Sequence, residues 1–244
     1  MQEIALVLLL LLLPLLFFLS FRVQAGKAGN LRPLPAVEEL AAAVGRSAET
    51  GKALHVSVGV AGVGGPQTAE TWAGLTLLAD LADKAATSGT PLIVTVADPT
   101  VVPLAQEILW RAHRRNGNPE DYDPTQVRFV APNPMAYSAG VAGLLLREPL
   151  TANVMVGTFG EEVLLMGEVA AREGVRQVAG TANPQALPLL AATADRTLIG
   201  EEIFAGGAYT ARQPLQVASL LAQDWARWAI VIAILAVAAA KLLL

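Results

Sequence analysis

Short apolar runs alternate with stretches of helical periodicity through the middle of this 244-residue chain, between about residues 33 and 212. The apolar runs are rich in β-branched residues, and turn-forming residues separate them from the helical stretches. The predicted strands are 54–60, 92–97, 127–131, 153–157, 177–179 and 197–199. The predicted helices between them are 37–49, 69–86, 101–115, 135–147, 161–173 and 185–194.

Strands this apolar, separated this regularly by helices, are typical of a parallel sheet with helices on both faces. We therefore expect a doubly wound, mostly parallel, Rossmann-like α/β domain over residues 36–212. Three dipeptides follow a predicted strand and open a helix: Asp98-Pro99, Asn133-Pro134 and Asn183-Pro184. In such a dipeptide the Asp or Asn side chain accepts a bond from a first-turn amide, and proline follows well because its missing N–H would lack a partner there.

The amino-terminal part of the chain is apolar in a different way. Residues 4–21 contain no charge. The length of this uncharged run is close to the roughly 20 residues that a helix needs to cross a bilayer. We therefore predict a transmembrane helix over residues 1–23, kinked at Pro14, and a linker over 24–35. The alternative is a secretory signal peptide cleaved near Ala25. Against it, residues 1–3 carry no basic residue and the apolar run is longer than a typical signal core.

The carboxyl-terminal part, residues 213–244, predicts a helix that includes a second membrane span. Residues 228–240 are apolar without interruption, and Lys241 lies where it could reach the far interface. Trp225 and Trp228 are typical of an interfacial belt at the near side. The alternative for this shorter run is a buried or amphipathic terminal helix.

Basic residues gather on the inner flanks of both predicted spans: Arg22, Lys27, Arg32, Arg212 and Arg227. By the positive-inside rule, this distribution predicts a two-pass protein of the inner membrane, with the central domain in the cytoplasm and both termini outside. The lipid bilayer is then its first expected partner. Acidic residues outnumber basic ones in the central domain, so we expect no binding to nucleic acid.

Composition excludes several kinds of chemistry. The chain has no cysteine, which removes disulfides, thiolate nucleophiles, iron–sulfur clusters and cysteine-bound zinc. Its two histidines are far apart in the sequence and form no metal-ligand pair. We expect His55 to be a hydrogen-bonded core or edge residue and His113 to complement the dipole at a helix end. We predict no catalytic residue, no metal ligand and no cofactor.

A glycine-rich segment, Gly59 to Pro66, follows the first predicted strand and precedes a long helix that Thr68 could cap. This is the setting in which backbone amides bind a pyrophosphate at a helix N-terminus. The dinucleotide pattern G-x-G-x-x-G is not met, because from Gly62 the third glycine falls on Gln67. The alternative is a flexible crossover with positive φ angles. The candidate ligand-binding residues of this segment are Gly59, Gly62, Gly64, Gly65 and Thr68.

Acidic pairs follow two predicted strands, in Gly160-Glu161-Glu162 and Gly200-Glu201-Glu202. Both lie at the carboxyl edge of the sheet, where open α/β sheets bind ligands. Oxygen-rich sites suit a divalent cation, but carboxylates in a first helical turn also interact favourably with the helix dipole. Further candidate ligand-binding residues at this edge are Asp98, Thr158, Glu161 and Glu201.

The predicted helix from residue 135 has no charge through residue 146 and contains several small residues. A helix that is apolar all round is buried all round, so we expect it either at the centre of the fold or covered by a second subunit. The candidate self-association residues, here and in the segment 203–209, are Tyr137, Ser138, Gly140, Gly143, Phe204 and Tyr209.

The segments VGTFGEE at 156–162 and LIGEEIFAGGAY at 198–209 carry a resemblance to a known family. The chain resembles a family of uncharacterised bacterial membrane proteins, classed as a domain of unknown function and found mainly in green non-sulfur bacteria. The resemblance implies two terminal membrane helices around a Rossmann-like domain. It implies no activity and no catalytic residue.

Three hypotheses for function follow. The first is a non-enzymatic, membrane-anchored scaffold that forms homo-oligomers. The second is a membrane-tethered sensor or enzyme that binds a nucleotide, another small molecule or a divalent cation at the carboxyl edge of the sheet. The third is an accessory subunit bound to other subunits of a membrane complex.

Overall fold

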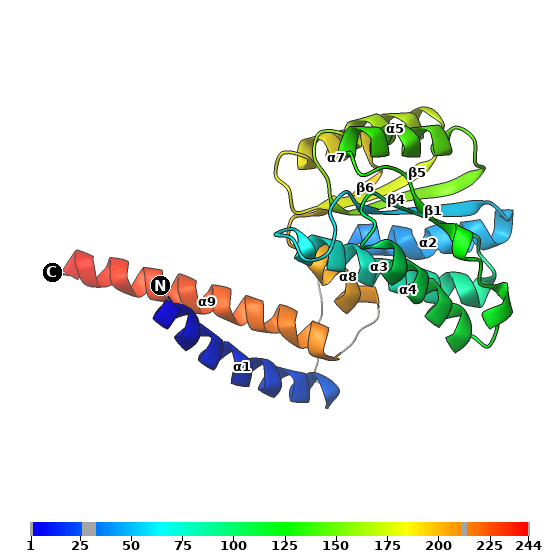
Figure 1. The fold of residues 1–244 in the computed structure, drawn as a ribbon. Coiled ribbons are helices and arrows are strands. Elements are labelled where there is room, and N and C mark those ends of the chain that lie inside the picture. Colours follow the sequence, from blue (N-terminus) through cyan, green and yellow to red (C-terminus); the bar gives the residue numbers. More distant parts are fainter. Residues whose placement is uncertain (1, 26–32, 211–213, 244) are drawn as a thin grey trace. The chain divides into compact units, whose positions relative to one another are not determined.

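The chain forms two compact units in a computed structural model that describes residues 2–25, 33–210 and 214–243 (Figure 1). One unit holds residues 33–206, and the other holds residues 1–32 and 207–244. Most of the predicted linker 24–35, and with it Lys27 and Arg32, lies outside the described residues, as does Arg212.

The α/β unit is built on one sheet of six parallel strands, in the order β3-β2-β1-β4-β5-β6. The strands are β1 (Ala53–Gly59), β2 (Leu92–Val96), β3 (Val127–Phe129), β4 (Leu150–Thr158), β5 (Arg176–Thr181) and β6 (Arg196–Ile199). The prediction of a parallel α/β sheet is therefore confirmed. All six predicted strands are present, with ends that differ by a few residues.

Helices cover both faces of this sheet (Figure 1). On one face lie α2 (Pro35–Thr50), α3 (Thr68–Ser88) and α4 (Val102–Arg115); on the other lie α5 (Pro134–Leu145), α6 (Val163–Arg172) and α7 (Leu187–Thr193). The chain runs outward from β1 to β3, and α5 then returns it to β4 beside β1. This reversal makes the carboxyl ends of β1 and β4 the switch point of the sheet.

The two faces of the sheet differ in chemistry. Leu54, Val56 and Val58 of β1 are buried on the face of α3, where Gly74 of α3 approaches Val58. The alternate residues His55 and Ser57 point to the face of α5, since side chains alternate along a strand. One face is therefore aliphatic, whereas the other combines an apolar cluster with buried polar side chains.

The predicted capping of helices by an Asp or Asn that precedes a proline is found in part. Asn133 caps α5, because its side chain accepts a hydrogen bond from the Ala136 amide at 3.1 Å. Asp98 and Asn183 instead accept from the amide two residues ahead, at 2.8 and 3.1 Å, and form turns that precede α4 and α7. The three dipeptides thus mark strand-to-helix junctions, although only Asn133 caps its helix directly.

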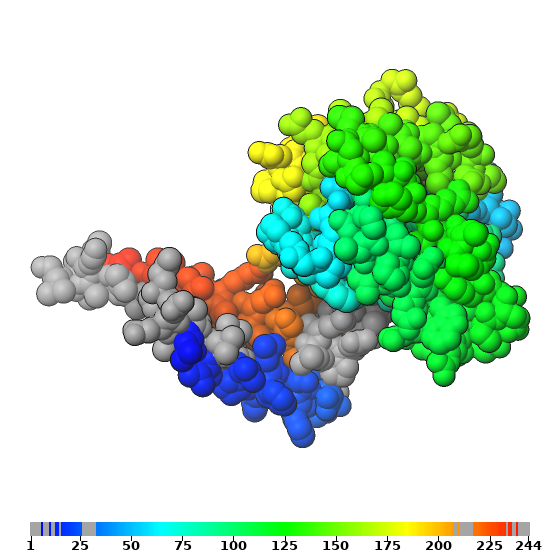
Figure 2. All heavy atoms as spheres, viewed as in Figure 1, coloured from blue at the N-terminus to red at the C-terminus, as the bar shows by residue number. Residues whose placement is uncertain are grey.

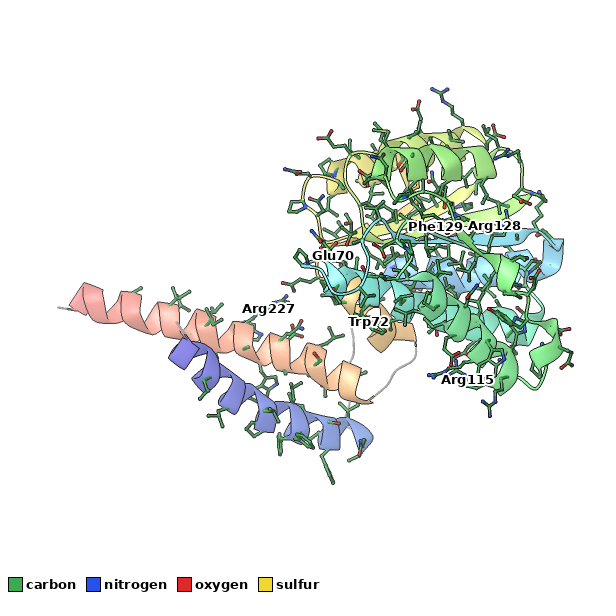
Figure 3. All side chains as sticks on the ribbon, in the orientation of Figure 1. Glu70, Trp72, Arg115, Arg128, Phe129 and Arg227 are labelled. Atoms are coloured by element: carbon green, nitrogen blue, oxygen red, sulfur yellow. The ribbon has the colours of Figure 1, made fainter. Side chains whose placement is uncertain are left out.

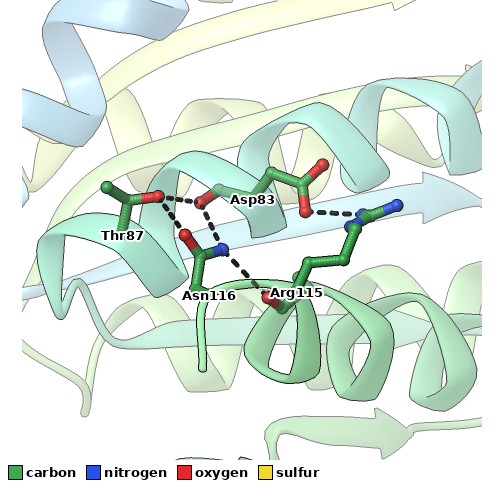
Figure 4. Close-up of polar contacts among 5 residues, drawn as sticks. Asp83, Thr87, Arg115 and Asn116 are labelled. Carbon is green, nitrogen blue, oxygen red and sulfur yellow. Dashed lines mark hydrogen bonds and ion pairs between the residues drawn. The ribbon is translucent and has the colours of Figure 1, made fainter. Parts of the chain in front are cut away.

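Polar side chains connect the C-terminal end of α4 to α3 (Figure 4). The Arg115 guanidinium pairs with the Asp83 carboxylate at 2.5 Å, and the Thr87 hydroxyl donates to the Asn116 side chain at 2.8 Å. The Asn116 amide also donates to the Ala112 carbonyl at 2.9 Å. Beyond it, two short 3-10 helices, η1 (Pro119–Asp121) and η2 (Pro124–Gln126), form the acidic connection to β3.

The second unit pairs α1 (Gln2–Gln24) with α9 (Pro214–Leu243). Leu19 of α1 is buried with Ala218 and Ala222 of α9. Pro14 lies inside α1 without ending the helix, as predicted. Within the residues that the structure describes, no helix combines the length and the apolar character needed to cross a membrane. The two predicted transmembrane helices are therefore not supported by this structure. The remaining helix, α8 (Glu202–Thr210), runs across the division between the two units.

Candidate functional site

The carboxyl ends of β1 and β4 approach each other so closely that only glycine fits. Gly59 has φ +95°, and a Cβ there would lie 2.6 Å from the Thr158 amide nitrogen. Gly157 has φ +151°, and a Cβ there would lie 2.1 Å from the Val58 carbonyl oxygen. The pairing of the two strands also shifts register between Ser57 and Gly59. This glycine pair brings the loops after both strands to one place at the edge of the sheet.

The loop after β1 is visible at the surface of the α/β unit (cyan in Figure 2), and its glycines have different roles. Gly62 lies against the Asp98 carboxylate, whose Cγ would be 2.4 Å from an added Cβ. Gly64 has φ +101°, which only glycine adopts easily. For Gly65 the structure shows no such constraint. This is the arrangement of a tight crossover.

Threonine side chains occupy two amides of this loop. The Gly64 amide donates to the Thr68 hydroxyl at 2.9 Å, and the Val63 amide donates to the Thr100 hydroxyl at 3.1 Å. The Thr68 hydroxyl donates in turn to the Gly65 carbonyl at 2.6 Å. The sequence suggested Thr68 as a possible cap of α3. In the structure Thr68 is instead the first residue of the helix, and its hydroxyl binds the loop. These amides are unavailable to a phosphate while the bonds persist, which favours the structural interpretation of the loop.

The two acidic pairs also bind their own backbone. Glu162 accepts a hydrogen bond from the Gly160 amide at 2.7 Å, and Glu202 accepts one from the Ile199 amide at 2.9 Å. The first glutamate of each pair, Glu161 and Glu201, is exposed. No group of three or more acidic or histidine side chains is placed to hold a metal ion in the described part of the chain. The second glutamate of each pair is thus a local structural residue.

Two polar atoms at this edge are buried without a hydrogen-bond partner among the described residues. One is Oε2 of Glu70, in the first turn of α3 (Figure 3), and the other is Oγ1 of Thr158, the last residue of β4. One turn after Glu70, Gly74 lies against the Val156 carbonyl of β4. Both atoms therefore belong to the switch point, and Glu70 was missed in the sequence because an acidic residue in a first helical turn is common.

His55 is a fully buried core residue, which confirms one of the two interpretations made from the sequence. Its Nδ1 lies 2.7 Å from Oδ1 of Asn153, and its Nε2 lies 2.9 Å from the Thr95 hydroxyl. Burial lowers the pKa of His55 to about 4, and the hydrogen bond to Asn153 offsets only part of this effect. A neutral imidazole shut away from solvent has no access to a substrate.

The charge-free helix α5 is partly buried and partly exposed. Tyr137 and Ser138 are completely buried, so they are not part of a surface that a second molecule can reach, contrary to the prediction. Gly140 lies against Val130, which would be 2.3 Å from an added Cβ, and Gly143 lies beside the Arg147 guanidinium. The helix faces solvent through other residues, Met135, Ala136 and Ala139, and Leu146, directly after the helix, is exposed as well. Met135 is 58% exposed and Leu146 is 60% exposed.

The other two candidate self-association residues lie on α8. Phe204 is 47% exposed on the part of α8 that belongs to the α/β unit. Tyr209 is half-buried and belongs to the helical unit. The candidate self-association residues are therefore divided between the two units.

Comparison with known protein families gives a match over almost the whole chain. The sequence model of a family described as "Domain of unknown function (DUF6754)" matches residues 1–243. No curated protein matches the chain significantly, and neither does any solved structure.

Proposed function

The chain belongs to the DUF6754 family, and we propose that it is a membrane-anchored, self-associating protein with a scaffolding role. The family description assigns no activity. The resemblance described above also implies a membrane anchor and a bacterial origin, and we propose both for this chain. The observation that carries it is the apolar surface of the helical unit.

Large apolar side chains are exposed on both helices of that unit. On α1, Phe17 and Phe21 are 70% and 75% exposed; on α9, Trp228, Ile232 and Leu235 are 62–69% exposed. Each large apolar side chain left in water forgoes roughly 1.5–3 kcal/mol of burial free energy. Large apolar side chains that gather on the surface are typical of an interaction with lipid or with another protein. Lipid is the occupant that we propose, because the sequence between residues 4 and 21 contains no charge.

Flotation with vesicles tests the anchor. The full chain should float with vesicles of phosphatidylethanolamine and phosphatidylglycerol, and a Phe17→Asp, Phe21→Asp variant should float several-fold less. Phe129→Asp is the matched control, because Phe129 is a 46% exposed phenylalanine on the α/β unit and should have no effect. If wild type and the double variant partition equally, lipid is not what covers these helices.

The absence of cysteine makes the proposed topology directly measurable. We propose an inner-membrane protein with a cytoplasmic α/β domain and both termini outside, supported by Arg22 and Arg227 on the inner flanks. In intact spheroplasts, a membrane-impermeant maleimide should label Glu3→Cys but not Glu120→Cys. Labelling of Glu120→Cys alone would show the inverted orientation. Labelling of neither would show that the helices do not cross.

Self-association is proposed through the exposed side of α5. Met135, Ala139 and Leu146 present an uncharged surface, and small residues allow a second backbone to approach closely. In detergent at micromolar concentration, wild type should scatter light as an oligomer, and Ala139→Glu should shift it toward monomer. Ala171→Glu, at an exposed alanine of α6, is the control. A monodisperse wild-type monomer would refute this part of the proposal.

A second candidate function is ligand binding at the carboxyl edge, favoured by the unpartnered oxygens of Glu70 and Thr158. A buried carboxylate oxygen and a buried hydroxyl, both without a partner at the carboxyl edge of the sheet, suit a small molecule with hydrogen-bond donors, because buried polar atoms normally have partners. Thermal-shift measurements with nucleotides, amines, polyols and divalent cations test it: a ligand should raise Tm for wild type but not for Glu70→Ala. The third hypothesis, an accessory subunit of a membrane complex, is tested by co-purification from native membranes.

A further inference from the structure

A row of buried polar side chains crosses the sheet beneath α5. His55 of β1, Asn153 of β4 and Gln177 of β5 are direct neighbours in the strand register. Ser57 of β1 is likewise the register partner of Thr95 of β2. All five are at most 1% exposed, as is Tyr137, which joins the row from α5. None of these residues contributes to the surfaces discussed above.

The orientation of the row is determined at Gln177. Its side-chain nitrogen donates to the carbonyls of Gly167 and Thr193, at 2.9 and 2.8 Å. The Gln177 oxygen therefore faces Asn153 and accepts from its Nδ2 at 3.3 Å. This leaves the Asn153 oxygen facing His55 Nδ1 at 2.7 Å, and an oxygen can only accept. The proton of the neutral imidazole is consequently on Nδ1.

This tautomer determines the direction of the hydrogen bonds in the other half of the row. Nε2 of His55 is an acceptor, so the Thr95 hydroxyl donates to it across 2.9 Å. The Thr95 oxygen then accepts from the Tyr137 hydroxyl at 2.7 Å, and Tyr137 accepts from Ser57 at 2.6 Å. Each hydroxyl donates once, in the same sense, from Ser57 toward His55. The row is one continuous hydrogen-bond chain.

We infer that this chain is an acid-responsive switch, in which protonation of His55 reverses the hydrogen bonds of Thr95 and Tyr137. When Nε2 takes a proton from solvent, the Thr95 hydroxyl turns to accept it and donates instead to Tyr137. Tyr137 then donates to the Thr95 main-chain carbonyl, which already lies 3.2 Å from its hydroxyl. One proton enters, the imidazole gains one positive charge, and no other group changes its charge.

The groups around the row determine the pH at which the switch responds. Among the described residues, the charged or titratable groups that interact with the row or with its neighbours are Tyr137 on α5, Arg128 on β3 with its partner Glu148, and Asp195, which accepts from the Gln177 main-chain amide. From α6 and α7, the row is contacted by the main-chain carbonyls of Gly167 and Thr193, which accept hydrogen bonds from Gln177. Burial, with a smaller contribution from Arg128, lowers the pKa of His55 to about 4, and burial raises the pKa of Tyr137 to about 12. The neutral chain therefore persists at neutral pH, and the reversed chain forms in acid.

Nitrogen NMR of the full chain in detergent tests the switch. The protein has two histidines, so ¹⁵N-histidine labelling with a His113→Gln variant assigns both. We expect Nδ1 of His55 to carry the proton at pH 7, with a titration midpoint near pH 4. Tyr137→Phe should lower this midpoint, because the turned Thr95 hydroxyl loses its acceptor, by about one pH unit or a tenfold smaller protonation constant. Asn153→Asp should raise it, since a carboxylate stabilises the imidazolium.

Two further variants complete the test. Thr95→Val removes the hydroxyl that accepts the new proton and should lower the midpoint, whereas Thr95→Ser retains it and should resemble wild type. This pair preserves the test if Tyr137→Phe does not fold. Tyr122→Phe, beside His113, is the control that leaves His55 unchanged. A proton on Nε2 at pH 7, or equal midpoints for Thr95→Val and Thr95→Ser, would overturn the inference.

Discussion

The pH dependence of stability follows from the buried imidazole of His55. Its pKa is about 4 when folded and 6.5 in the unfolded chain, so between these values the unfolded state binds more protons. The contribution of His55 is present in full above pH 6.5 and is lost as the pH falls toward 4. A difference of this size corresponds to about 3 kcal/mol.

Guanidinium unfolding at several pH values measures this loss. Between pH 7 and pH 4 the wild type should lose about 3 kcal/mol more than His55→Gln, which cannot titrate in this range. The comparison removes the contribution of the carboxylates, since both proteins share them. Parallel pH profiles for the two proteins would contradict the prediction.

The polar row shows what sequence reasoning could not reach at the residue scale. The sequence identified His55 as a hydrogen-bonded histidine within a strand. Its partners Thr95 and Asn153 are 40 and 98 residues away in the chain, and their contact depends on the register of three strands. Register is set by packing of the whole sheet, so no local pattern predicts which polar residues meet.

At the scale of elements, close packing of α3 on the sheet gives a sharp prediction. A Cβ on Gly74 would lie 2.3 Å from the Val156 carbonyl oxygen, whereas a Cβ on Gly45 of α2 meets nothing within 4 Å. Gly74→Ala should therefore destabilise the protein by about 1–3 kcal/mol through overpacking. Gly45→Ala should stabilise it by roughly 0.5–1 kcal/mol, because alanine is the better helix former.

Thermal melting of the two variants checks this prediction. The substitutions are chemically identical and both lie in helices, so they differ only in the space available. The Tm should fall for Gly74→Ala and rise for Gly45→Ala. A similar Tm change in both variants would show that α3 can move away from β4 at little cost.

The elements themselves were largely predictable, because each carries a local signal. Apolar β-branched runs gave all six strands, and helical periodicity gave α2 to α7. Errors lie where side chains fold back on the backbone: α6 begins at Val163, two residues later than predicted, because Glu162 binds the Gly160 amide. Thr68, considered as a possible cap of α3, is the first residue of that helix and binds the preceding loop instead. Both errors concern which backbone group a polar side chain near the start of a helix binds.

At the scale of the whole molecule, the division into two units predicts independent folding. The α/β unit encloses its own core on both faces of the sheet. A fragment of residues 33–210, which keeps α8 intact, should therefore be soluble without detergent and should melt in one cooperative transition. Circular dichroism during heating measures this. A fragment that stays unfolded, or that melts without cooperativity, would show that the core depends on α1 or α9.

The glycine pair at the ends of β1 and β4 has a consequence for the evolution of this family. Gly59 and Gly157 each lie where an added Cβ would collide with the backbone of the other strand. A side chain at either position is therefore expected to push the two halves of the sheet apart where β1 and β4 meet. Homologues that keep this contact should keep both glycines, even where the loops that follow them have diverged beyond alignment.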